Sequence, residues 1–135
     1  MTFQYAPAPE STAIVNINSS NDLFINGEFT PGHGNPFKTI NPATEEVLAE
    51  IAHANEEDVN AAVMAARKAY DKTWSKMSGR DRGKYLFRIA RLIQERSREL
   101  AVLETLDNGK PIRESRDVDV PIAAAHFFYH AGWAD

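Results

Sequence analysis

The chain has 135 residues, of which 43% are hydrophobic and 25% are charged, and its formal net charge at pH 7 is −4. This length and composition indicate about one domain of an ordinary soluble globular protein, and the acidic balance gives no reason to expect a nucleic-acid partner. The sequence has no cysteine, no signal peptide and no apolar run long enough to cross a bilayer, which excludes disulfides and predicts a cytoplasmic protein without a membrane partner.

The first residues predict an arm and then a hairpin. Residues 1–21 mix Pro, Ala, Ser, Thr and Asn, and "PAPEST" within them is typical of a flexible arm. In "LFINGEF", Asn26 and Gly27 between apolar flanks predict a type I′ turn, because both central residues of that turn need positive φ. Two extended runs then flank "NPAT". We therefore predict a small antiparallel β element over residues 23–53.

The sequence next changes to a helical period. Asn55 and Asp58 have the spacing of a helix N-cap and an acidic third residue, and apolar residues at helical intervals predict a helix over residues 56–72. The stretch "SGRD" repeats the capping pattern before a second helix over residues 79–95. A third helix is predicted over residues 97–107, where the glycine and proline of "NGKP" stop it.

A fourth helix is predicted within residues 115–135, with Pro121 in its first turn or at a kink. Its end, "HFFYHAGWAD", is rich in aromatic side chains and needs a surface to pack against. Nothing later in the sequence supplies that surface, so we expect a truncated chain.

Motifs alone place no catalytic site on this sequence. His126 and His130 have a spacing that zinc sites use, but no acidic residue lies between them, so we interpret them as packing or solvent-exposed side chains. The basic stretch 80–99 could bind a membrane or an acidic partner, but interleaved acidic residues favour a solvated helix face. The glycines form no phosphate-binding pattern, and no Ser–His–Asp arrangement is supported by spacing.

Four stretches follow one another in the order found in the N-terminal part of the aldehyde dehydrogenase superfamily: "LFINGEF", "FKTINPATEEVLAEIAHANEEDVNAAVMAARKAYD", "RLIQERSRELAVLETLDNGKPIRES" and "FFYHAGWAD". The resemblance covers about residues 22–135 and is closest to the betaine-aldehyde and general NAD-dependent enzymes. It implies an incomplete α/β fold of the aldehyde dehydrogenase type, with an N-terminal β-hairpin element followed by about four helices. Residues 22–135 would form the N-terminal part of the cofactor-binding domain, before its nucleotide-binding strands.

The resemblance also implies an activity for the parent enzyme. Family members oxidise aldehydes to carboxylic acids with NAD or NADP, and they are homo-oligomers. Their nucleophilic cysteine, general-base glutamate and cofactor-binding strands follow the part that this sequence resembles. The resemblance therefore implies that this chain has no catalytic or cofactor-binding residues of its own, is inactive alone, and partners the remainder of an aldehyde dehydrogenase chain.

One family site falls within the sequence. Related enzymes bind potassium or sodium near the start of the fold, and the resemblance places the ligands at the backbone carbonyls of Thr39 and Ile40 and the carboxylate of Asp107. Oxygen ligands suit such a hard cation, and the C-terminal end of a helix adds its negative dipole. The alternative is that Asp107 only accepts hydrogen bonds from backbone N–H groups of the next turn.

A second function remains open at this point. The chain could be an independently folded helical module that binds a partner or itself without catalysis. Its contact surface would then include the aromatic residues Phe127, Phe128, Tyr129 and Trp133.

Overall fold

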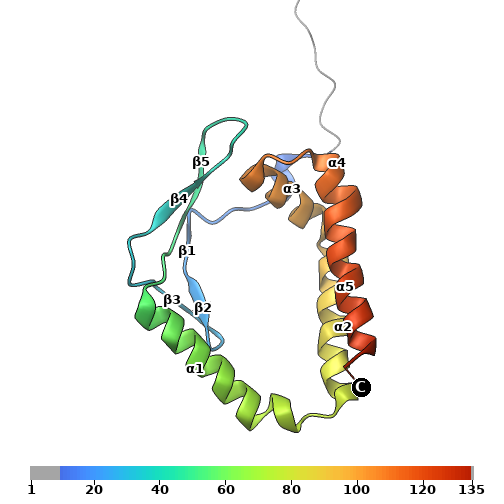
Figure 1. Ribbon diagram of the computed structural model, residues 1–135. Helices are drawn as coiled ribbons and strands as arrows, with labels where there is room; N and C mark the ends of the chain where they lie inside the picture. Colours follow the sequence, from blue (N-terminus) through green and yellow to red (C-terminus); the bar gives the residue numbers. More distant parts are fainter. Residues whose placement is uncertain (1–9, 135) are drawn as a thin grey trace, which may run out of the picture.

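The computed structural model describes residues 10–134, which form an open ring (Figure 1). The strands are β1 (Ser20–Asn21), β2 (Leu23–Ile25), β3 (Glu28–Thr30), β4 (Phe37–Ile40) and β5 (Val47–Ile51). The longer helices are α1 (Glu56–Lys72), α2 (Gly79–Glu95), α3 (Ser97–Asn108) and α5 (Val120–Gly132). The short helices are η1 (Thr12–Ile14), η2 (Trp74–Lys76), α4 (Ile112–Glu114) and the π-helical η3 (Ser115–Asp119). The strands and α1 make one side of the ring, and α2 and α5 lie side by side on the other.

The predicted hairpin is confirmed. Asn26 has φ 56° and Gly27 has φ 89°, which are the left-handed conformations that a type I′ turn requires. Strands β2 and β3 pair antiparallel on either side of this turn. Phe24 and Phe29 face each other across the pair, with their ring centroids 5.0 Å apart.

The other strands correct the prediction of one antiparallel element over residues 23–53. Strands β2 and β3 form a separate two-stranded sheet, and a three-stranded sheet has the order β1-β5-β4. Strand β1 pairs parallel with β5, whereas β4 pairs antiparallel with β5. A two-residue strand such as Ser20–Asn21 has no alternating pattern to read, and its partner lies far along the chain. Helix η1 and β1 both lie within the predicted arm, of which residues 1–9 are outside the described part.

Helices α1 and α2 begin and end where the sequence predicts, because their caps are local. Asn55 Oδ1 accepts the Asp58 N–H at 3.0 Å, and Asp58 Oδ2 accepts the Asn55 N–H at 2.9 Å. Ser78 Oγ likewise accepts the Asp81 N–H at 3.1 Å. Each side chain satisfies an N–H group that has no partner within the helix.

The last helical run differs from the prediction over residues 115–135. It begins earlier, at α4, and continues through the π-helical η3 into α5, with Pro121 in the first turn of α5 as predicted. Ser115, the first residue of η3, is fully buried, and its Oγ lies 3.1 Å from Thr105 Oγ1 of α3. The change from α-helix to π-helix therefore coincides with a tertiary contact to α3, and the local sequence pattern could not predict such a contact.

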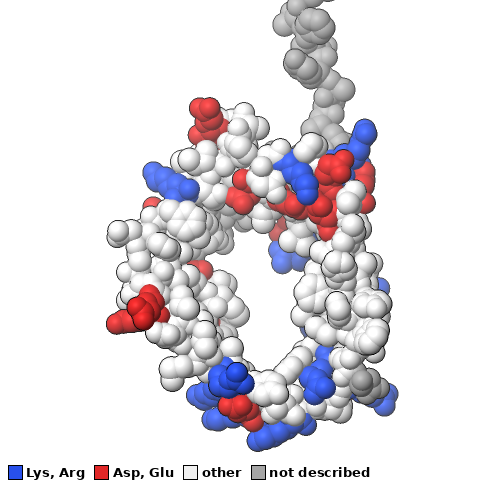
Figure 2. Space-filling view, viewed as in Figure 1, with Lys and Arg blue, Asp and Glu red and all other residues white. Residues whose placement is uncertain are grey.

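Small residues make the buried centre of the described part of the chain. The buried hydrophobic side chains are Ala49, Ala90, Ala101, Val102, Val120 and Ala124. Large apolar side chains are exposed instead, including Met64 at 73% and Tyr129 at 60%. Figure 2 shows an opening through the middle of the molecule, surrounded mainly by uncharged residues. Residues 10–134 therefore enclose no centre of large apolar side chains, although their helices are amphipathic.

Candidate functional site

The structure brings together two of the three residues predicted to bind a cation. Thr39 of β4 donates its side-chain hydroxyl to Asp107 Oδ1 in the last turn of α3, across 68 positions of sequence. Ile40 follows at an irregularity of the β4–β5 register, where it pairs with Val47. A carboxylate and a hydroxyl oxygen thus meet at a helix C-terminus, where a positive charge is favourable.

The turns on either side of this contact also pack together. Gly109 caps α3 with φ 78°, and a β-carbon at this glycine would lie 2.7 Å from Pro42 Cγ. Asn41 shapes the loop that carries Pro42, because its Oδ1 accepts the Ala43 N–H at 2.9 Å. The sequence stretches "INPATEE" and "LETLDNGKP" therefore form one junction. Past the end of α3, the Lys110 N–H donates to Asn108 Oδ1 at 2.8 Å.

A cavity of about 690 Å³ lies next to this junction. Its lining is mainly apolar, with Leu48 and Leu103 among the lining residues, and it also includes the acidic residues Glu99, Glu104 and Asp107. Within residues 10–134, however, no three His, Cys, Asp or Glu side chains gather closely enough to hold a metal ion. A cation here would need backbone and hydroxyl oxygens in addition to Asp107.

Lys110 is a residue of this region that the sequence did not single out. Its ammonium forms an ion pair with Asp119 at the end of η3 and lies 3.9 Å from Glu104 Oε1 of α3. The hydrogen bond to Asp119 raises the pKa of Lys110. The ion pair fixes the turn after α3 to the start of α5, but its partners are too far apart in sequence for a motif to reveal.

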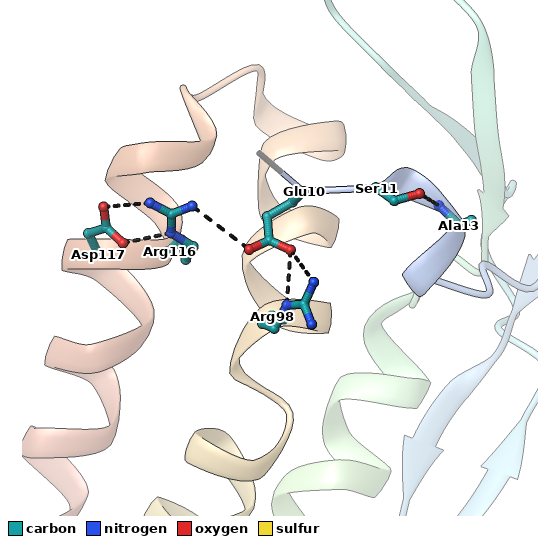
Figure 3. A network of polar contacts seen from close by, with 6 residues as sticks. All are labelled: Glu10, Ser11, Ala13, Arg98, Arg116 and Asp117. Carbon is teal, nitrogen blue, oxygen red and sulfur yellow. Dashed lines mark hydrogen bonds and ion pairs between the residues drawn. The ribbon is translucent and has the colours of Figure 1, made fainter. Parts of the chain in front are cut away.

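A second polar cluster joins the N-terminal segment to the helices (Figure 3). The side chain of Glu10 is only 8% exposed, and its Oε2 accepts hydrogen bonds from Arg98 Nε at 3.0 Å and Nη2 at 2.8 Å. Its Oε1 lies 3.8 Å from Arg116 Nη1, and Arg116 also pairs with Asp117. Glu10 thus connects the start of the described chain to both α3 and η3.

Both clusters join segments of the chain through hydrogen bonds and ion pairs. The contact of Thr39 with Asp107 also brings together two oxygen atoms of a kind that suits a cation. His126 and His130 lie on α5, where the His130 ring packs edge-on against Tyr129 at 5.2 Å. In the described part of the chain, no helix is both long and apolar enough to span a membrane.

Comparison with known proteins identifies the family. Residues 29–135 match the family model described as the aldehyde dehydrogenase family, and the chain belongs to that family. It is 47% identical over 119 residues to aldehyde dehydrogenase family 2 member B4, mitochondrial, of Arabidopsis thaliana; this match covers 87% of the chain and 22% of that relative. It is 44% identical over 118 residues to the mitochondrial aldehyde dehydrogenase of Rattus norvegicus, covering 85% of the chain and 23% of that relative.

Solved structures agree with the fold. An NAD+ complex of aldehyde dehydrogenase from Bacillus cereus superposes with a TM-score of 0.83 at 44% identity, covering 87% of this chain and 24% of that one. The gamma-glutamyl-gamma-aminobutyraldehyde dehydrogenase of Burkholderia cenocepacia gives a TM-score of 0.85 at 41% identity, covering 92% and 25%. The chain therefore spans about a quarter of the length of these relatives, and the predicted aldehyde dehydrogenase-like α/β fold is confirmed.

Proposed function

We propose that this chain acts as the N-terminal scaffold of an NAD(P)-dependent aldehyde dehydrogenase, which oxidises an aldehyde to a carboxylic acid. The observation that carries the proposal is that this chain, a member of the family, forms an open ring and leaves large apolar side chains exposed. Val63, Phe87 and Leu103 are 62%, 53% and 38% exposed. Burial of such surface is the main favourable term in folding, so these faces suit further protein of the same enzyme, the remainder of the aldehyde dehydrogenase chain.

The chemistry belongs to that remainder in this proposal. Aldehyde, water and NAD(P)+ would give carboxylic acid, NAD(P)H and a proton, through attack of a cysteine thiolate on the aldehyde. This sequence has no cysteine, and its described residues offer no glycine-rich turn from strand to helix for a dinucleotide. The NAD+ complex of the Bacillus cereus relative supports NAD or NADP as the cofactor of the whole enzyme.

We also propose that Thr39, Ile40 and Asp107 bind potassium or sodium in the enzyme. The contact of the Thr39 hydroxyl with the Asp107 carboxylate supports this, because it gathers oxygen atoms at the C-terminal end of α3. An aspartate at this end of a helix is unfavourable unless a positive charge compensates it.

Two further parts of the proposal concern the assembly and its location. The hairpin exposes Phe24 at 64% and Phe29 at 73%, which supports a homo-oligomer with this hairpin directed toward a subunit interface. Sedimentation velocity of the full enzyme tests this, since a sharp monomer would contradict it. We place the enzyme in the cytoplasm, which cell fractionation tests.

The activity is tested by following reduced cofactor spectroscopically when the full-length protein is mixed with an aldehyde and NAD+ or NADP+. Formation of reduced cofactor that requires the aldehyde supports the proposal, and its absence with a broad panel of aldehydes contradicts it.

Deleting residues 1–135 from the enzyme should abolish activity and leave aggregated protein, because the scaffold is lost. No observation on the described residues favours the alternative of an independent helical module.

A further inference from the structure

The carboxylate of Asp58 collects hydrogen bonds from two segments of the chain. Besides the Asn55 N–H at the start of α1, its Oδ2 accepts the His33 N–H at 2.9 Å. Its Oδ1 lies 2.6 Å from His33 Nδ1. Asp58 is 5% exposed, whereas the side chain of His33 is 66% exposed. A buried cap residue is therefore bonded to a histidine whose ring faces solvent.

The loop that carries His33 is held closely from its other side. Gly34 donates its N–H to the His53 carbonyl at 2.8 Å. A β-carbon at Gly32 or Gly34 would lie 2.4 or 2.7 Å from that carbonyl oxygen, so only glycine fits at either position. Residues 31–36 thus lie between the end of β5 and the start of α1, and they connect the hairpin to β4.

The charges around His33 favour its protonated form. The hydrogen bond to Asp58 raises the pKa of His33 above 6.5, and the charges of Asp58 and Glu57 act in the same direction. The N–H groups of His33 and Asn55, followed by the His33 ring, lower the pKa of Asp58 from 3.8 to about 2. The ionised carboxylate can only accept, so Nδ1 of His33 carries the proton of the short contact. The other imidazole near the loop is His53, which packs edge-on against Phe37.

These shifts define a pH window. A raised histidine pKa contributes stability that is complete below 6.5 and is lost as the pH rises through the folded-state value. The lowered pKa of Asp58 contributes stability above 3.8 that is lost as the pH falls toward 2. Between 3.8 and 6.5 both groups are charged and the contact is strongest. Near neutral pH only the histidine changes its charge.

We propose that His33 and Asp58 form a pH-responsive latch, in which the imidazolium holds the 31–36 loop on the start of α1 and loss of its charge loosens the loop. The capping box of Asn55 and Asp58 does not depend on the imidazole and stays closed. The latch would adjust how firmly the hairpin is attached to α1.

Native-state hydrogen exchange of the full-length protein tests the latch at the His33 amide, which donates to Asp58. Exchange is expressed as a protection factor, so that the intrinsic pH dependence of exchange cancels. Between about pH 5.5 and about pH 8.5, which brackets histidine titration, protection of the His33 amide should fall about two- to fivefold, as for an exposed ion pair. Protection of the Asp58 amide, which donates to Asn55, should stay constant.

Variants identify the titrating group. His33→Lys keeps its charge over this range and should show little change in protection at residue 33, and His33→Asn should be weakly protected throughout. His53→Asn removes the neighbouring imidazole and should keep the wild-type profile. Protection at residue 33 that does not change with pH in the wild type would overturn the latch. A fall in this protection that persists in His33→Asn, or that disappears only in His53→Asn, would also overturn it.

Discussion

Gly109 ends α3 directly against Pro42, so that a β-carbon at position 109 would lie 2.7 Å from Pro42 Cγ. The glycine also has φ 78°, a conformation that residues with a side chain rarely adopt. Two separate requirements for glycine thus coincide at the junction that brings Asp107 to Thr39. The position can be compared with Gly27, which has φ 89° but no atom within 4 Å of its β-carbon site.

Gly109→Ala should destabilise the enzyme more than Gly27→Ala. The positive φ alone costs about 1 kcal/mol in either variant, and overpacking against Pro42 adds about 1–3 kcal/mol at position 109. The midpoint of urea unfolding measures both variants under one set of conditions. Equal midpoints would show that Pro42 moves aside at no cost.

A second pair of glycines tests the packing of α2 on α5. A β-carbon at Gly83 would lie 2.8 Å from the Ala131 carbonyl oxygen, whereas nothing lies within 4 Å of the site at Gly132. Alanine gains about 1 kcal/mol over glycine in a helix interior, but a backbone oxygen on the facing helix cannot rotate away. We expect Gly83→Ala to lower the thermal midpoint and Gly132→Ala to leave it unchanged or raise it slightly. A rise for Gly83→Ala would mean that the two helices separate easily.

The helices could be predicted from the sequence because their signals are local. Asn55 with Asp58 marks the start of α1, and Gly109 marks the end of α3. The parallel pairing of β1 with β5 could not be predicted, since a two-residue strand carries no period. The sequence also predicts amphipathic faces without saying what covers them. Val63, for example, is one of the apolar residues at helical intervals in α1, and it is 62% exposed.

The candidate site shows the same limit. Thr39 and Asp107 are 68 positions apart, and their pairing came from resemblance to a family rather than from spacing. Glu10 and Arg98 are 88 positions apart. Glu10 lies in "PAPEST" and Arg98 in the basic stretch 80–99, but nothing in either stretch indicates that the two side chains pair. Single-sequence reasoning finds caps and turns, whose partners lie within about four residues. It does not find ion pairs that form only after the chain has folded.

Acid titration gives a prediction at Asp58. Its lowered pKa, about 2 against 3.8, means that its contribution to stability is present above 3.8 and is lost as the pH falls through about 2. The thermal midpoint of the wild type should therefore fall more steeply between these values than that of Asp58→Asn, which has no carboxylate to protonate at this position. Asp81→Asn is the matched control, because Asp81 follows the same capping pattern but its side chain is 48% exposed. If Asp81→Asn changed the pH dependence of the thermal midpoint, relative to the wild type, more than Asp58→Asn does, the loss of stability in acid could not be assigned to Asp58.

The proposed cation site makes the last prediction. Thr39→Val removes the hydroxyl that contacts Asp107 but keeps the shape of the side chain, and Thr39→Ser keeps the hydroxyl. A bound cation raises the thermal midpoint in proportion to the logarithm of its concentration over Kd. Potassium chloride should stabilise the wild type and Thr39→Ser beyond an equal concentration of tetramethylammonium chloride. Thr39→Val should need about tenfold more potassium for the same shift, a loss typical of groups that orient a metal ligand, and Asp107→Asn should show no specific shift. If potassium and tetramethylammonium act alike on the wild type, Asp107 holds no cation and its carboxylate serves only to bind Thr39.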